Sequence, residues 1–344
     1  MDTMTAPRPP RAVLTWGRDH VDPALRTAVD TLPASIRRIA GFHFGWCDEH
    51  GDPLVGSGGG KALRPTLTLL AAEAAAGECA AALPAAVAVE LVHNHSLLHD
   101  DVIDGDRLRR HRPTAWSVFG MGCAIHAGDA LLTLAYDVLA TACGSRAGDA
   151  VRLLAAAEQD LLAGLMDDLA FESRTDVRLG ECVRMAQAKT GALRGCACAL
   201  GALSASDDER SIGPARAFGE QLGFAFQLID DILGIWGDPA VTGKPVHSDL
   251  SSRKKSLPVV AALTSGTEAG SELAALYGGT GPLPDDDLAS AVALVTAAGG
   301  RRWAEAEASR QLEGALAELH GFGVSARATA ELEALARLVT TRDH

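Results

Sequence analysis

Three carboxylates stand at the end of an apolar helical run in the segment Leu98-His99-Asp100-Asp101-Val102-Ile103-Asp104. Asp100 and Asp104 are four residues apart, so a helix places them on one face, one turn above the other, with Asp101 beside them. Such a cluster repels itself unless cations lie between the carboxylates. Oxygen ligands favour a hard ion such as Mg²⁺, which shares its shell with substrate phosphates. With the two arginines that follow, the segment predicts a magnesium-bridged diphosphate site; a solvated acidic helix end is the plainer alternative.

A second acidic pair ends another apolar run, in Gln227-Leu228-Ile229-Asp230-Asp231-Ile232-Leu233-Gly234. Like the first pair, it is trailed by cations, here Lys244 and the pair Lys254-Lys255. Two facing carboxylate clusters can hold several Mg²⁺ ions around one diphosphate, while trailing lysines and arginines neutralise its remaining oxygens. We therefore expect a single site built from both halves of the chain.

Apolar residues recur at helical spacing along the chain, as in Leu153-Leu154-Ala157-Leu161-Leu162-Leu165. The chain is 47% hydrophobic with only 4% aromatic residues, so its core must be built mainly from Ala, Leu and Val, and chains rich in Ala and Leu form helices well. No sustained two-residue alternation bounded by hairpin turns occurs. The predicted fold class is all-α, a single-domain bundle of many helices around a central cavity over residues 12–344. The proline-containing residues 1–11 are expected to form a loose tail.

The ordered motifs resemble those of the trans-isoprenyl diphosphate synthases, and the resemblance covers most of the chain. The run Gly59-Gly60-Lys61-Ala62-Leu63-Arg64-Pro65 is similar to the family's glycine-lysine-arginine-proline motif. His93 falls where the family has a His or Gln, and the aspartates of 98–104 match its first aspartate-rich motif. The resemblance implies an isoprenoid synthase fold. It also implies that isopentenyl diphosphate is bound by Lys61, Arg64, His93 and Arg110.

Further matches follow in the family's order along the chain. They are Arg109, Asp168, Lys189-Thr190, Gln227, Asp230, Asp231, Lys244 and Lys254. The resemblance implies that the basic and polar members of this set bind the allylic diphosphate. It makes Asp168 and the aspartates of both motifs, Asp100, Asp101, Asp104, Asp230 and Asp231, the Mg²⁺ ligands. The catalytic residues implied are the five motif aspartates and Lys189.

The implied reaction condenses isopentenyl diphosphate with an allylic diphosphate, using Mg²⁺, three ions per site by resemblance. Ionisation of the allylic C–O bond, addition of the isopentenyl double bond and loss of a proton extend the chain by five carbons, with no covalent nucleophile. Product length should be set one or two helical turns before the first aspartates, at Val92, His95 and Ser96. The expected product is C20 geranylgeranyl diphosphate, with C15 farnesyl diphosphate next.

Three residues depart from the family pattern, and two of them, Gly234 and Leu165, keep other functions open. Gly234 stands where the second motif usually has a third aspartate, Leu165 where a Gln usually precedes Asp168, and His95 where many members carry an aromatic residue. A non-catalytic or regulatory subunit of a prenyl synthase is one alternative. A class I terpene cyclase is another, although the chain's only asparagine, Asn94, does not begin the second metal motif of such cyclases. A helical scaffold would leave the ordered charged residues unexplained.

Charge and composition limit the partners. The formal net charge of −13 disfavours nucleic acid, whose phosphates require a basic face. No uninterrupted apolar run reaches the roughly 18 residues of a membrane span, and no signal-peptide core is present, so a cytoplasmic protein without stable membrane insertion is expected. The seven cysteines lack paired C-x-x-C spacing, which disfavours disulfides and zinc. A homodimer is expected from the resemblance.

Two tempting motifs are not supported. The run Gly56-Ser57-Gly58-Gly59-Gly60-Lys61 lacks the first glycine and the final Ser or Thr of a phosphate-binding P-loop. His95 and His99 lie four residues apart, a spacing that suits a metal ion on a helix, and His93 is close by. No Glu or Cys near them completes a zinc site, so we expect none there.

Overall fold

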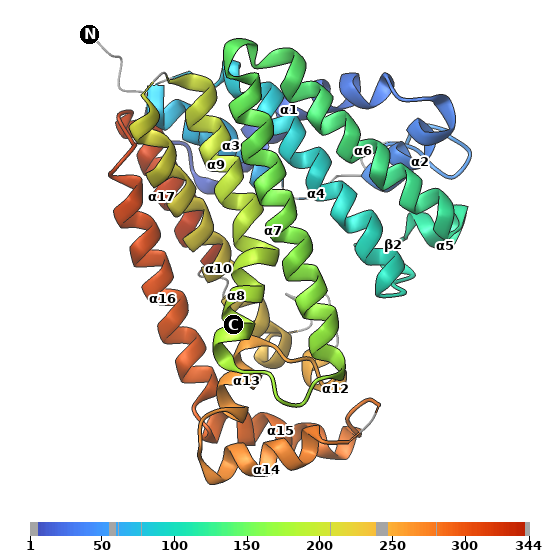
Figure 1. Ribbon diagram of the computed structural model, residues 1–344, viewed down its shortest axis with the longest axis vertical. Helices are drawn as coiled ribbons and strands as arrows, with labels where there is room; N and C mark the ends of the chain where they lie inside the picture. Colours follow the sequence, from blue (N-terminus) through green and yellow to red (C-terminus); the bar gives the residue numbers. More distant parts are fainter. Residues whose placement is uncertain are drawn as a thin grey trace. The chain divides into compact units, whose positions relative to one another are not determined.

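The computed structural model describes residues 6–54, 60, 62–76, 78–206, 208–238, 247–279 and 281–340. Within these ranges the regular structure is mainly helical, with the two-residue strands β1 (Leu108–Arg109) and β2 (Arg112–Pro113), which pair antiparallel, and an isolated bridge between Cys47 and Pro53. The predicted all-α fold class is confirmed (Figure 1). Lys61 and Lys244 lie outside the described residues.

The chain forms two compact units. Unit 1 comprises Met1–Ala156, Cys196–Arg216 and Gly321–Leu332, and unit 2 comprises Ala157–Gly195, Ala217–His320 and Glu333–His344. Four of the five boundaries fall inside helices, namely α7 (Ala147–Ser173), α9 (Ala192–Ala205), α10 (Ile212–Trp236) and α17 (Ala326–Thr340). The expected single domain over residues 12–344 stays a prediction.

Unit 1 is centred on α4 (Leu83–Ile103), the helix that ends in the first aspartate motif. The other helices that lie wholly in unit 1 are α1 (Pro10–Asp30), α2 (Ala34–Phe44), α3 (Leu63–Ala76), α5 (Ala115–Phe119) and α6 (Met121–Ala142), with the short 3₁₀ turns η1 (Ala80–Ala82), η2 (Gly144–Arg146) and η4 (Glu209–Ser211). α4 packs beside α6 and α3, and its Leu91, Val92 and Leu98 side chains are fully buried (Figure 1). This burial holds the acidic end of α4 in a fixed place within unit 1.

Unit 2 carries the second aspartate motif near the end of α10. Its remaining elements are α8 (Leu179–Ala186), the π-helical turn η3 (Gln187–Gly191), α12 (Ser248–Ser251), α13 (Leu257–Leu263), α14 (Glu268–Tyr277), α15 (Asp285–Ala297) and α16 (Gly300–Leu319). Phe224, Leu228 and Ile232 of α10 pack with Leu257 and Val260 of α13 in one apolar cluster. The face of α10 that fills this core therefore also fixes the orientation of Asp230 and Asp231, which lie between Leu228 and Ile232.

One helix, α6, is long and apolar enough for a membrane span by length and composition among the residues that the structure describes. Its most apolar window is 39% buried, and the helix includes Asp129 and Asp137. Leu131, Ala135 and Leu139 are fully buried in unit 1, where α6 packs against α4. The core helices of water-soluble domains have this pattern too, so length and composition alone carry no membrane assignment.

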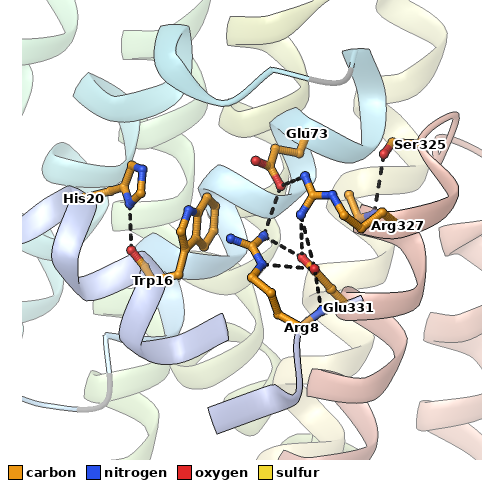
Figure 2. Close-up of polar contacts among 8 residues, drawn as sticks. Arg8, Trp16, His20, Glu73, Ser325, Arg327 and Glu331 are labelled. Carbon is orange, nitrogen blue, oxygen red and sulfur yellow. Dashed lines mark hydrogen bonds and ion pairs between the residues drawn. The ribbon is translucent and has the colours of Figure 1, made fainter. Parts of the chain in front are cut away.

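Arg8, within the stretch 1–11 that is expected to form a loose tail, makes specific contacts in unit 1. α1 begins at Pro10, and the Arg8 backbone and guanidinium donate hydrogen bonds to the Glu331 carboxylate, whose side chain is fully buried. Figure 2 shows Arg8 reaching both Glu331 and Glu73, while Arg327 contacts the same two carboxylates. Arg8 also lies 3.9 Å above the Trp16 ring. A local sequence pattern does not reveal a contact with residues so far along the chain.

Replacing Glu331 with glutamine should lower the free energy of unfolding by about 2–3 kcal/mol, because Arg8 and Arg327 each lose the more deeply buried of the two carboxylates that they share. Although burial raises the pKa of Glu331, the hydrogen bonds and charge of Arg8 outweigh it, so the pKa lies below the usual 4.5. A carboxyl whose pKa is lower in the folded than in the unfolded state stabilises the protein at pH values above its unfolded-state pKa. This stabilisation is lost as the pH falls through the folded-state pKa. The difference between wild type and variant, measured by urea unfolding, should therefore shrink below about pH 4.5.

The matched control is Glu333→Gln, two residues along the same helix. Glu333 pairs with Arg337 at 2.8 Å, but both side chains are about half exposed. Its loss should change stability by less than about 0.5 kcal/mol. Equal destabilisation by the two substitutions would show that the buried position of Glu331 has no special weight.

Candidate active site

The first aspartate motif has one buried member, Asp101, and two members that are more exposed, Asp100 and Asp104. The Asp101 side chain is only 1% exposed, and the Arg109 Nε donates a hydrogen bond to its Oδ1 at 2.6 Å. Burial raises the pKa of Asp101, and the nearby Arg109 charge opposes that shift. Asp100 is partly buried, whereas Asp104, at the end of α4, is exposed. Asp100 and Asp104 are thus the members of the motif that are accessible from solvent.

A cavity lined by arginines lies beside this motif in unit 1. Arg110 occupies the left-handed turn between β1 and β2, with φ of 52°. A side chain at Gly60 would place its Cβ 2.6 Å from an Arg110 Nη atom, so only a glycine lets this guanidinium approach so closely. Lining residues of either charge include Arg18, Glu90, Asp101, Arg109, Arg110 and Arg112. The concentration of guanidiniums suits a small polyanion.

Three polar side chains that line this cavity, those of His43, Glu90 and Asn94, are connected by hydrogen bonds. Asn94 donates to Glu90 Oε1 and lies 3.1 Å from His43 Nε2 through its Oδ1. Burial, followed by the charge of Arg109, lowers the pKa of His43 to about 3, so this imidazole is neutral near pH 7. Burial raises the pKa of Glu90, opposed by Arg64. Asn94, the only asparagine of the chain, is therefore held by hydrogen bonds to other polar side chains of unit 1.

Arg64 and His93, both expected to bind isopentenyl diphosphate, are brought together by the fold. Arg64 Nη1 lies 3.1 Å from His93 Nε2, although the two residues belong to the different helices α3 and α4. A guanidinium can only donate, so His93 Nε2 accepts. The arrangement fixes the planar donor group of Arg64, which can then engage an anion without losing much side-chain freedom.

In unit 2, Asp168 and Lys189 form a direct ion pair. Lys189 Nζ donates to Asp168 Oδ2 at 2.6 Å, and the two side chains are 31% and 25% exposed. Lys189 lies in the π-helical turn η3, a rare widening of a helix that often occurs at functional positions. Gly164 allows this turn to approach α7, because its Cβ would lie 2.4 Å from the Lys189 backbone nitrogen. The pair remains accessible to a ligand.

The second aspartate motif is organised by hydrogen bonds from both sides. Thr190 donates to Gln227 Oε1 at 2.8 Å, and Gln227 Nε2 donates to Asp231 Oδ1, also at 2.8 Å. The backbone N–H of Leu257 donates to the other oxygen of Asp231. Burial raises the pKa of Asp231 to about 6, although Lys254 opposes the shift. Asp230 is less buried than Asp231, so the second motif also has an inward and an outward member.

A carboxylate that sequence reasoning missed, Asp249, lies against the departure at Gly234. The Cβ of a larger residue at 234 would lie 2.5 Å from Asp249 Oδ2, so Asp249 occupies the space that a side chain on α10 would fill. Asp249 is 7% exposed. Desolvation would lower the pKa of Lys254, but Asp231, Asp249, Asp168 and Asp230 together raise it. Nothing in the linear spacing linked Asp249 to Gly234.

The chain-length candidates Val92, His95 and Ser96 are all buried on α4. Ser96 donates a hydrogen bond to the His93 carbonyl, and the His95 ring lies 4.4 Å from the ring of His99, centroid to centroid. The two aspartate motifs belong to different units, so their union in one site stays a prediction. The positions of Lys61 and Lys244 are not among those the structure describes.

An all-α fold in which one helix ends in an aspartate motif and another carries an aspartate pair near its end, with arginine or lysine close to each, is typical of the isoprenoid synthase type of protein. Comparison with known proteins gives the family. Residues 46–295 match the model of the polyprenyl synthetase family. The chain belongs to this family, and the resemblance read from the sequence is confirmed. It is therefore a prenyltransferase.

Individual relatives are similar over nearly the whole chain. The chain is 46% identical to a (2E,6E)-farnesyl diphosphate synthase of Mycobacterium tuberculosis, over 96% of this chain and 92% of that protein. It is 43% identical to a geranylgeranyl diphosphate synthase of the same species, over 97% and 94%. A crystal structure of a polyprenyl synthetase from Streptomyces coelicolor is similar with a TM-score of 0.88 and 43% identity, covering 95% of this chain and 98% of that one.

Proposed function

We propose that the protein is a short-chain trans-prenyltransferase that condenses isopentenyl diphosphate with an allylic diphosphate. The observation that carries the proposal is that acidic and basic side chains lie together: Asp101 pairs with Arg109, Asp168 pairs with Lys189, and the charge of Asp231 acts on Lys254. Relatives named for farnesyl and geranylgeranyl products support a C15 or C20 product. We favour geranylgeranyl diphosphate, which is the product expected from the sequence.

The donor set fits magnesium. The aspartates available at both motifs and Asp168 provide oxygen ligands alone, which Mg²⁺ prefers, and the family is generally magnesium-dependent. We assign Mg²⁺ binding to Asp100, Asp104, Asp168 and Asp230, with Asp101 and Asp231 holding the motifs in place; three ions per site follows from the family resemblance. When bound, Mg²⁺ would neutralise charge on the departing diphosphate.

The protein side chains divide the two substrates between them. Arg64, His93 and Arg110, with Lys61, hold isopentenyl diphosphate so that its double bond faces the allylic carbon. Arg109, Lys189, Thr190, Gln227 and Lys254, with Lys244, bind the allylic diphosphate and stabilise it as the allylic C–O bond breaks. A new C–C bond then forms from the isopentenyl double bond. Loss of one proton to the released diphosphate completes the extension.

We propose that both units belong to one domain, because this chemistry draws on residues of each. The boundaries that fall inside α7, α9, α10 and α17 support this proposal, because a continuous helix links the two units at each. We also infer a cytoplasmic homodimer without stable membrane insertion or nucleic acid binding. Gel filtration with light scattering will measure the subunit number.

Replacing His95 with alanine should lengthen the product by at least one five-carbon unit. His95 is buried on α4, between one and two turns before Asp100, where the growing hydrocarbon tail would pass. Removal of the ring opens space along that helix. Chromatography of the dephosphorylated products measures the shift. An unchanged distribution would mean that His95, which lies against Gly128 of α6, takes no part in limiting the product length.

Product analysis tests the function itself. The purified protein is incubated with Mg²⁺, isopentenyl diphosphate and, separately, dimethylallyl, geranyl and farnesyl diphosphates. A discrete prenyl diphosphate of C15 or C20 is expected. A cyclic hydrocarbon would identify a cyclase instead. Absence of elongation from every primer would identify a non-catalytic or regulatory subunit of a prenyl synthase, the alternative raised by Gly234 and Leu165.

A further inference from the structure

Two facing helices of unit 1 bring a set of metal-binding side chains together. His95 and His99 lie on adjacent turns of α4, and Asp129 comes from α6. One ligand atom from each residue can be chosen so that all three lie within 4.8 Å of one another. Sequence reasoning had no acidic partner for the histidine pair, because Asp129 is distant along the chain and meets it only through helix packing. The structure supplies the missing carboxylate.

The spacing fits a tetrahedral site. His99 Nε2 lies 3.4 Å from Asp129 Oδ1. Two ligand atoms bound at roughly 2.0–2.1 Å to a tetrahedral ion are about 3.3 Å apart, so this edge of the site is already close to its bound length. Residue 128 must be glycine for the approach, because its Cβ would lie 2.6 Å from both the Cδ2 and the Nε2 atoms of His99. α6 thus leaves room for imidazole rings at this point.

The solvent exposure of these side chains and the present hydrogen bond of His99 are also compatible with a bound ion. His95 is buried, whereas the His99 and Asp129 side chains are 25% and 55% exposed, so an ion can enter from solvent. His99 Nε2 also lies 3.1 Å from the Ile125 carbonyl, its partner when the nitrogen carries a proton. Binding of an ion at Nε2 would replace that hydrogen bond. His126, at 3.9 Å from the other Asp129 oxygen, lies within reach as an additional ligand.

We propose that His95, His99 and Asp129 form a binding site for a divalent transition-metal ion, best matched by Zn²⁺, that joins α4 to α6. Two imidazoles and one carboxylate are a zinc ligand set, with water or His126 in the fourth position. Mg²⁺ prefers oxygen ligands and does not compete well for imidazole nitrogen. The site is therefore distinct in chemistry from the aspartate motifs, and its existence does not depend on the proposed function.

Titration of the chelator-treated full-length protein tests the site. Co²⁺ serves as a coloured probe and Zn²⁺ as the competitor, with excess Mg²⁺ present so that the aspartate motifs are saturated. The wild-type protein should bind one equivalent of Co²⁺ with the visible absorption of a tetrahedral complex, and Zn²⁺ should abolish that absorption. Asp129→Asn and His99→Ala should each weaken binding at least about 10²-fold. Zn²⁺ should raise the melting temperature of the wild type and leave that of both variants unchanged.

The control is His50→Ala, which removes an exposed histidine that pairs with Glu49 at the surface. This variant should bind Co²⁺ as the wild type does. Asp129→Asn preserves the shape of a half-exposed side chain, so folding of that variant is expected and is checked by its melting temperature without metal. Equal affinity in the wild type and both ligand variants, or absence of tetrahedral absorption in the wild type, would overturn the proposal whatever the prenyltransferase activity.

Discussion

Replacing Asp249 with alanine should lower kcat/KM for prenyl transfer by roughly 10²-fold, and the double variant Gly234→Asp with Asp249→Ala should recover most of that loss. Asp249 lies where a side chain at position 234 would be, and its charge acts on Lys254 together with the aspartates of the second motif. The double variant moves the carboxylate from α12 to α10 with little change in its place. Steady-state kinetics with saturating Mg²⁺ measures both variants.

Two further variants separate charge from packing. Asp249→Asn keeps the shape of the side chain and should lose nearly as much activity as the alanine variant. Gly234→Asp alone should be impaired, because two side chains would then require the same space. Asp238, which is exposed beyond α10, serves as the comparison, and its replacement with alanine should change the rate less than about 2-fold. If the double variant were no better than Asp249→Ala, Asp249 would not stand in for the missing aspartate.

The sequence allowed the helical fold class, the aspartate motifs and several of their basic partners to be predicted. These features depend on local spacing: apolar periodicity places Asp100, Asp101 and Asp104 at a helix end, and the match in motif order leads to Lys189 and Lys254. Relations of this kind depend on neighbours within a turn or two of helix or on ordered motifs. They are visible without knowing which helices pack together.

The contacts that were missed all join residues distant in sequence. Asp249 against Gly234, Asp129 beside His99 and Arg8 on Glu331 each depend on how two separate elements pack. From the sequence alone, Gly234 indicates a lost ligand. In the structure, the absence of a side chain at this position makes room for the carboxylate of Asp249. Only the packed structure distinguishes a lost group from a relocated one.

Replacement of Asp100 or Asp104 with alanine should reduce kcat/KM by at least about 10²-fold and raise the Mg²⁺ concentration needed for half-maximal rate. These are the outward carboxylates of the first motif, one partly buried and one exposed, and we assign them to metal binding. Rates measured over a Mg²⁺ series at fixed substrate concentrations give both quantities.

Asp101→Asn should behave differently, because Asp101 is buried and pairs with Arg109 at 2.6 Å. The amide oxygen of asparagine can still accept a hydrogen bond from Arg109, but the uncompensated guanidinium is then held less firmly. We expect a lower rate and a raised KM for the allylic substrate, with the Mg²⁺ dependence little changed. A Mg²⁺ requirement raised as much in Asp101→Asn as in Asp100→Ala would mean that Asp101 ligates the ion directly and that its contact with Arg109 is given up when the substrate binds.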